Sequence, residues 1–197
     1  NDYISVDESA ELLEVSKKYT FFPWSAQKNV KAEVIAKAKG VYFYTATGRK
    51  FLDFASQLIN MNIGHGNPRV ANAVAKQMNE LDFVCPALFT TKVRGEVGRK
   101  IAEIAPGNLT KTFFTLGGAE AIENAMKIAR WFTGKQKILT QYRSYHGATH
   151  ASITAGGDPR NQAVYQNAMP NIVHFEGPFP YRCPWNGKTE EESCNLA

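Results

Sequence analysis

A glycine pair near the middle of the chain could bind a phosphate group. Gly117 and Gly118 follow the apolar run Thr112–Leu116 and precede a stretch, from Ala119 onward, whose apolar residues recur at helical spacing. This pattern predicts a strand, a turn without side chains and a helix. The first amides of a helix have no acceptor within it, and the helix dipole favours an anion there. The sequence therefore predicts a phosphate site at this turn.

A second group of chemically useful residues follows the next predicted strand. Tyr145, His146 and Gly147 come shortly after the apolar stretch Lys137–Gln141. In parallel α/β sheets, ligands bind at the carboxyl ends of the strands, so these residues should lie on the same rim as the glycine pair. We therefore expect an aromatic ring, an imidazole and a phosphate-binding turn to lie together.

Hydrophobic periodicity and turn residues predict the elements that must position these groups. The expected helices are Ser9–Lys18, Pro68–Leu81, Thr91–Ile104, one from Ala119 that ends at Gly134, and one after Thr149. The expected strands are two or three antiparallel strands within Ala32–Phe54, turning at Ala46-Thr47-Gly48, and single strands at Lys137–Gln141 and Asn171–Phe175. Residues 177–197 contain three prolines and an acidic triplet, and we expect a loop there.

Composition excludes several classes of protein. The 197 residues are 44% hydrophobic and 21% charged, which is typical of a globular domain. The net charge of +5 is spread along the chain without a dense basic stripe, so nucleic-acid binding is not expected. No apolar run approaches the length of a membrane span. Cys85, Cys183 and Cys194 are odd in number and widely spaced, which predicts free thiols in a cytoplasmic protein and no metal site.

Four segments, in their order along the chain, resemble the class III aminotransferases. GGAEAIENAMKIAR and YRSYHGATHASITAGGDPR resemble the coenzyme-binding half of that family. GVYFYTATGRKFLD resembles its N-terminal β-meander, and NIGHGNPRVANAVAKQ resembles its Gly-His-x-x-Pro segment with the helix that follows. The resemblance extends from roughly Phe22 to His174. It implies an α/β fold of fold type I, with pyridoxal 5′-phosphate (PLP) as the coenzyme.

The resemblance also implies a domain organisation. Residues 1–54, with a helix and antiparallel strands, would form part of the small domain. Residues 55–197 would form part of the large coenzyme domain, whose mixed or parallel sheet would be truncated at its C-terminus.

Residue by residue, the resemblance assigns coenzyme roles to both groups of residues. Gly117, Gly118 and Ala119 become the phosphate cradle, Tyr145 stacks on the pyridine ring, and His146 stands beside that ring. Taken alone, Tyr145 would more often be a packing residue and His146 a hydrogen-bonded structural one. Family members often have a polar Asn-Ser or Asn-Thr pair before the turn glycine. Here Leu116 stands there, so either Thr115 supplies the hydroxyl or main-chain amides suffice.

Two aromatic residues are assigned to the substrate pocket. Trp24 corresponds to an N-terminal aromatic that lines this pocket in the family, although packing is the competing interpretation. The family's active site forms at a dimer interface, and Phe89, in the segment CPALFTT, is the candidate that reaches the partner's pocket. His65 lies in a glycine-flanked turn before the helix start at Pro68, and we expect it to be structural.

The implied function is transfer of an amino group from an amine or omega-amino acid donor to a keto acid such as pyruvate. In the family, a lysine that forms a Schiff base with the coenzyme and an acidic residue at the pyridine nitrogen lie well downstream of the Tyr-His-Gly segment. Both would lie beyond Ala197, so we expect no catalytic residue in this chain and interpret it as an N-terminal fragment. The family further implies a homodimer or a dimer of dimers, with no nucleic-acid or membrane partner.

Three alternatives stay open at this point. A same-fold aminomutase or racemase would show the same motifs, and the need for an external keto acid would separate it from a transaminase. A non-catalytic coenzyme-binding or dimerisation module would lack the downstream lysine. A nucleotide-binding α/β protein is disfavoured, because the chain lacks both the G-x-G-x-x-G spacing and the P-loop lysine.

Overall fold

The computed structural model describes residues 3–196, which divide into two compact units with a boundary after Thr91. Each unit contains both helices and strands. The first unit ends within the chain at residue 91 and the second begins with a helix at Lys92. The predicted division of the whole fold into domains at residues 54 and 55 stays a prediction.

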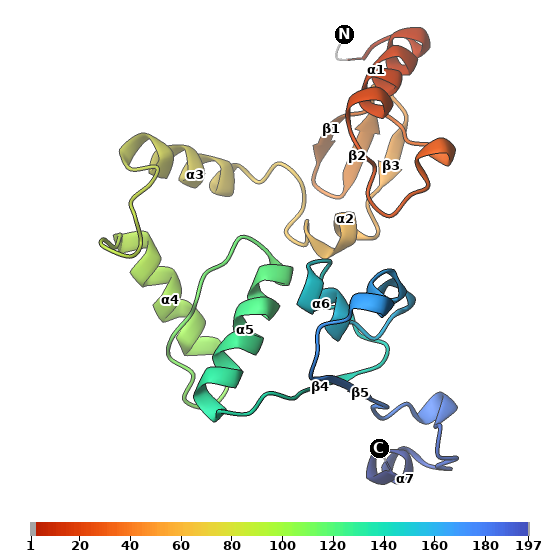
Figure 1. Ribbon diagram of the computed structural model, residues 1–197. Coiled ribbons are helices and arrows are strands. Elements are labelled where there is room, and N and C mark those ends of the chain that lie inside the picture. Colours follow the sequence, from red (N-terminus) through yellow and green to blue (C-terminus); the bar gives the residue numbers. More distant parts are fainter. Residues whose placement is uncertain (1–2, 197) are drawn as a thin grey trace. The chain divides into compact units, whose positions relative to one another are not determined.

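An antiparallel sheet of three strands forms the centre of the first unit. Its strands β1 (Ile35–Lys39), β2 (Tyr42–Thr45) and β3 (Lys50–Leu52) follow one another as a meander (Figure 1). Phe43 lies directly opposite Phe51 in the ladder, and their rings stack with centroids 5.1 Å apart. The strands and the turn predicted within residues 32–54 are confirmed.

Capping residues fix where the helices of the first unit begin. Helix α1 (Val6–Tyr19) starts after Ser5, whose hydroxyl accepts the N–H of Glu8 at 3.1 Å. Helix α3 (Pro68–Glu80) starts after Asn67, whose side chain caps it, and has proline at its first position. Both predicted helices are confirmed, and a short 3₁₀ helix, η1 (Gln27–Asn29), lies between α1 and the sheet.

A left-handed turn, α2 (Ser56–Ile59), was not expected from the sequence. Its four residues have φ between 47° and 67°, a region that costs a residue with a side chain about 1–2 kcal/mol. Asp53 supports the turn with both carboxylate oxygens: Oδ1 accepts the N–H of Gln57 at 3.1 Å, and Oδ2 lies 2.6 Å from His65 Nε2. His65 is also paired with Gly40 through main-chain hydrogen bonds. The structural role expected for His65 is confirmed.

The second unit contains a parallel pair of strands packed with helices. It comprises α4 (Lys92–Ile104), α5 (Gly118–Thr133), β4 (Ile138–Gln141), α6 (His150–Ala155), η2 (Pro159–Asn167), β5 (Ile172–Phe175), η3 (Pro180–Arg182) and α7 (Glu190–Leu196). Strands β4 and β5 are parallel, with Ile138 opposite Ile172. Met126 of α5 and Ala151 and Ala155 of α6 form the buried core. A set of partly buried residues surrounds that core: Ile122, Ile138, Met169 and Ile172.

Two expectations for this unit are wrong. Residues 112–116 are not a strand, because no strand within residues 3–196 pairs with them and a strand exists only as part of a ladder. The stretch from Gly177 onward is not all loop, since η3 and α7 lie within it; Ala197 lies outside the described residues. Thr189 Oγ1 accepts the N–H of Glu192 at 3.0 Å, and Glu192 accepts the N–H of Lys188 at 2.8 Å. This near capping box starts α7.

Much of the apolar surface of the described chain is uncovered. The predicted apolar face of α3 shows Val70, Val74 and Met78 at 49%, 53% and 63% exposure. The buried apolar residues, in contrast, are the few that form the core of the second unit, together with Ala46. Among the helices of the described part, none is long and apolar enough to cross a membrane.

The Asp53–His65 pair gives a pH-dependent prediction. Burial raises the pKa of Asp53, but hydrogen bonds from His65 and Gln57 outweigh it, so the pKa is lowered. The pair therefore stabilises the fold fully above the unfolded carboxyl pKa of about 4, and this stabilisation is lost as pH falls through the lower folded pKa. The free energy of unfolding, measured with urea, should fall between neutral pH and about pH 3 in the wild type. We expect it to fall less in Asp53→Asn, which lacks the carboxylate.

The control for this experiment is Glu33→Gln, which breaks the exposed Arg49–Glu33 pair. Because exposed pairs contribute little, this variant should keep the wild-type acid profile. An Asp53→Asn protein with an unchanged acid profile would contradict the assignment.

Candidate functional site

The glycine turn before α5 has the geometry of an anion site. Gly117 is the N-cap residue in an extended conformation, and within the described residues no side chain caps this helix. The amides of Gly118 and Ala119 therefore lack an acceptor inside the helix. A Cβ atom added at Gly117 or Gly118 would meet nothing within 4 Å, so the turn is open to an incoming group. The predicted turn and helix are confirmed, with the helix starting one residue earlier than expected.

Two side chains stabilise this turn through hydrogen bonds to its main chain. Glu120 Oε2 accepts the N–H of Leu116 at 2.9 Å, and Thr115 Oγ1 donates to the carbonyl of Gly117 at 3.1 Å. The hydroxyl proton of Thr115 is thus engaged within the turn. Of the two ways to hold a phosphate that the sequence left open, this contact favours the main-chain amides.

Gly147 joins the two predicted groups of residues. Its φ is +127°, and a Cβ atom there would lie 2.5 Å from Ala119 Cβ and 2.8 Å from Ser152 Oγ. Real Cβ atoms do not approach so closely, so only glycine fits. This contact places the Tyr145-His146-Gly147 segment directly against the first turn of α5. The two motifs meet at this contact, while the placement of the Tyr145 and His146 side chains at the turn and their roles stay predictions.

His146 is anchored to strand β4 through a buried threonine. Its Nε2 lies 3.2 Å from Thr140 Oγ1, and the same hydroxyl donates to the carbonyl of Ala155 at 2.8 Å. Because a hydroxyl has one proton to donate, Thr140 must accept from His146, so Nε2 carries a proton. This bond fixes the tautomer and the orientation of the imidazole.

Tyr145 lies in the loop after β4 and is 48% exposed. The guanidinium carbon of Arg160 lies 4.3 Å from the centroid of its ring. Arg160 is paired in turn with Asp158, at 2.8 Å from Nε to Oδ1 and 2.9 Å from Nη2 to Oδ2. The hydrogen bond from Arg160 is the main cause that lowers the pKa of Asp158. The ring of Tyr145 is therefore held by a charged pair from a later segment.

The arrangement combines amides for an anion, an oriented imidazole and an aromatic ring. Comparison with known proteins shows which family the chain belongs to. Residues 25–196 match the model of the family described as aminotransferase class-III. The chain belongs to this family. It is 39% identical over 163 residues to the acetylornithine aminotransferase of Bacillus amyloliquefaciens, an alignment that covers 83% of this chain and 68% of that protein.

Two further relatives extend the comparison. The isoleucine 2-epimerase of Lentilactobacillus buchneri is 33% identical over 95% of this class-III aminotransferase chain and 41% of its own length. The crystal structure of the taurine:2-oxoglutarate aminotransferase of Bifidobacterium kashiwanohense, in complex with PLP and glutamate, matches 88% of this chain with a TM-score of 0.83 and 33% identity. This match confirms the α/β fold of fold type I. The chain spans 39% of that structure's chain, and thus less than half of either relative.

Sequence reasoning missed a carboxylate that binds the residues just after the Tyr-His-Gly segment. Glu123 Oε1 accepts the hydroxyl of Thr149 at 2.6 Å and the N–H groups of Ala151 and Ser152 at 3.0 and 3.3 Å. Glu123 of α5 therefore caps α6, just after Gly147. Asp158 and Arg160 were also missed, although Asp158 before Pro159 is a typical helix-start signal.

The two residues assigned to the substrate pocket lie in the first unit, whereas the glycine turn lies in the second. Trp24 is 66% exposed and has a φ of 56°, which is unusual for a bulky residue. Phe89 is 62% exposed, and its N–H donates to the carbonyl of Cys85 at 2.9 Å. Their substrate roles stay predictions.

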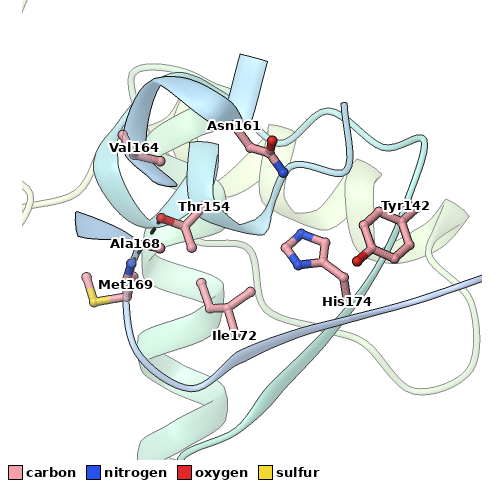
Figure 2. Close-up of a pocket in the computed structure, with 8 residues that line it drawn as sticks. All are labelled: Tyr142, Thr154, Asn161, Val164, Ala168, Met169, Ile172 and His174. Carbon is pink, nitrogen blue, oxygen red and sulfur yellow. Dashed lines mark hydrogen bonds between the residues drawn. The ribbon is translucent and has the colours of Figure 1, made fainter. Parts of the chain in front are cut away.

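A small cavity of about 140 Å³ lies beside the β4–β5 pair (Figure 2). Tyr142 and His174 stack at one side of it with ring centroids 5.1 Å apart. At the other side, the hydroxyl of Thr154 accepts the N–H of Met169 at 3.2 Å (Figure 2). None of the predicted site residues lines it, so this cavity belongs to the packing of η2 on the sheet.

The described residues also bear on the sequence predictions for metal ligands and cysteines. Within the described residues, no group of three His, Cys, Asp or Glu side chains is arranged to hold a metal ion. Cys85, Cys183 and Cys194 are free thiols, as predicted.

The contact at Gly147 can be tested by adding one methyl group. We expect Gly147→Ala to lower the free energy of unfolding by about 2–4 kcal/mol, because it adds a steric clash with Ala119 to an unfavourable φ. Gly107→Ala is the control: its φ is +62° but nothing lies within 4 Å, so it should cost only about 1 kcal/mol. Equal losses in urea unfolding of the two variants would show that the contact with α5 is not tight.

Proposed function

We propose that this class-III aminotransferase transfers an amino group from an amine or omega-amino acid donor to a keto acid such as pyruvate, with PLP as its coenzyme. One observation carries the proposal: Gly147 packs against Ala119, which brings the segment that contains Tyr145 and His146 against the first turn of α5, whose amides have no side-chain cap. Two of its relatives, the acetylornithine and the taurine:2-oxoglutarate aminotransferases, support an amine donor and a keto acid acceptor.

The residues present fit PLP. The amides of Gly117, Gly118 and Ala119 would hold the phosphate at an open helix N-terminus. Tyr145 would stack on the pyridine ring, and His146, with its Nε2 proton engaged by Thr140, would stand beside it. When bound, PLP supplies an electron sink for the bond that breaks at the substrate carbon. The chain's own residues would therefore anchor the coenzyme and fix its plane.

We assign no catalytic residue to residues 1–197. The Schiff-base lysine and the acid at the pyridine nitrogen are proposed to come from the part of the family's fold that this chain does not span. The exposed Phe89 and Trp24 are proposed to contact substrate, Phe89 across a homodimer interface. Residues 1–54 and 55–197 are proposed to belong to the small and large domains, and the protein is proposed to act in the cytoplasm.

A second candidate is a same-fold racemase or aminomutase. The observation in its favour is the isoleucine 2-epimerase, which is 33% identical over 95% of this chain. In such an enzyme the product keeps the amino group of its own substrate, so no external keto acid is needed. The requirement for an acceptor therefore separates the two functions.

The experiment is a spectrum of the full protein loaded with PLP. A panel of amines is added without acceptor, and we expect at least one donor to bleach the yellow band of the bound coenzyme and pyruvate or 2-oxoglutarate to restore it. This result requires that the amino group stays on the coenzyme until a keto acid arrives. Restoration of the band without any keto acid, together with racemisation of an added amino acid, would favour the racemase.

A further inference from the structure

Arg160, in the first turn of η2, has its guanidinium over the ring of Tyr145. At 4.3 Å from the ring centroid, the guanidinium is well within the distance at which a cation is attracted to an aromatic face. The contact joins Tyr145, in the loop after β4, to Arg160, which follows α6 and is distant in sequence. It therefore restrains the tilt of the tyrosine ring from one side.

Arg160 is itself held in place. Asp158 forms two parallel hydrogen bonds with the guanidinium, at 2.8 and 2.9 Å, and accepts the N–H of Arg160 at 2.8 Å. A bidentate pair fixes the plane of a guanidinium as well as its position. The cation is thus presented to Tyr145 in one orientation.

The start of η2, which contains this pair, is hydrogen-bonded through Gly157 to the segment that contains Tyr145. Gly157 accepts the N–H of Arg143 at 2.8 Å and donates its own N–H to Ser144 at 2.9 Å. A Cβ atom at Gly157 would overlap the main chain of Gln141 and Tyr142, so the two segments pack without a side chain between them. These main-chain contacts fix the backbone next to the Asp158–Arg160 pair relative to the segment that contains Tyr145.

We propose that Arg160 is a positioning residue that holds the ring of Tyr145 in the plane in which it stacks on PLP. This inference rests on the proposed function, because it needs Tyr145 to contact the coenzyme. Arg160 itself acts through Tyr145 and contacts neither coenzyme nor substrate. Asp158 supports it by fixing the guanidinium.

The chain offers a matched control. Arg143 lies 4.2 Å from the centroid of Phe179 and is paired with Glu176 at 3.4 Å. This is the same chemistry, an arginine over an aromatic ring with an acidic partner, on a ring with no proposed coenzyme role. Replacing Arg143 should therefore report the general cost of losing such a contact.

The test measures PLP binding to the apo form of the full protein by equilibrium dialysis, with visible circular dichroism of the bound coenzyme at saturation. We expect Arg160→Met to weaken PLP binding about two- to fivefold and to reduce the dichroism per bound coenzyme. Arg160→Lys should lie between this variant and the wild type, and Arg143→Met should match the wild type. Asp158→Asn, which keeps the arginine but loosens it, should show a smaller change in the same direction.

A double-variant cycle shows whether Arg160 acts through Tyr145. In a Tyr145→Leu background, Arg160→Met should cause no further loss of PLP affinity. Equal affinity and dichroism for Arg160→Met and the wild type would overturn the inference, as would a full additional loss in the Tyr145→Leu background. If the wild-type protein binds no PLP, the proposed function fails first and the inference falls with it.

Discussion

The close approach of Gly147 to Ala119 is the contact on which the site depends. It requires glycine on one side, because of both the left-handed φ and the space, and a small residue on the other. Through this contact, a loop that follows β4 meets the N-terminus of α5. Without it, the glycine turn would be an ordinary helix start, and Tyr145 and His146 would be two residues of a surface loop.

Polar contacts then fix each side chain relative to this contact. Thr140 orients His146, Glu123 of α5 caps the helix that follows Gly147, and Asp158 holds Arg160 against Tyr145. The bond from Glu123 joins two helices that are distant in sequence, and the contact of Arg160 with Tyr145 joins two separate segments. The described core is small, so these hydrogen bonds, and not extensive apolar packing, give the site its order.

The sequence predicted what local patterns decide and missed what distant contacts decide. Asn67 before Pro68 and the glycines at 117 and 118 are local signals, and α3 and α5 start where they indicate. The cap at Ser5 was missed, so α1 starts at Val6 and not at the expected Ser9. The left-handed turn at Ser56–Ile59 depends on Asp53 and His65, so its residues alone give no sign of it. Residues 112–116 have strand-forming side chains but no neighbouring strand. Helix α7 did have a signal, the Thr189–Glu192 spacing, which the surrounding prolines obscured.

If main-chain amides at the start of α5 hold the phosphate of PLP, removing one of them with Gly118→Pro should weaken binding of the coenzyme. Gly118 is the first residue of α5, where proline is compatible with a helix, so the variant removes one amide without breaking α5. Gly118→Ala, which keeps the amide, is the control. We expect Gly118→Pro to bind PLP about tenfold more weakly than Gly118→Ala at similar stability. Equal affinity of the two variants would contradict it.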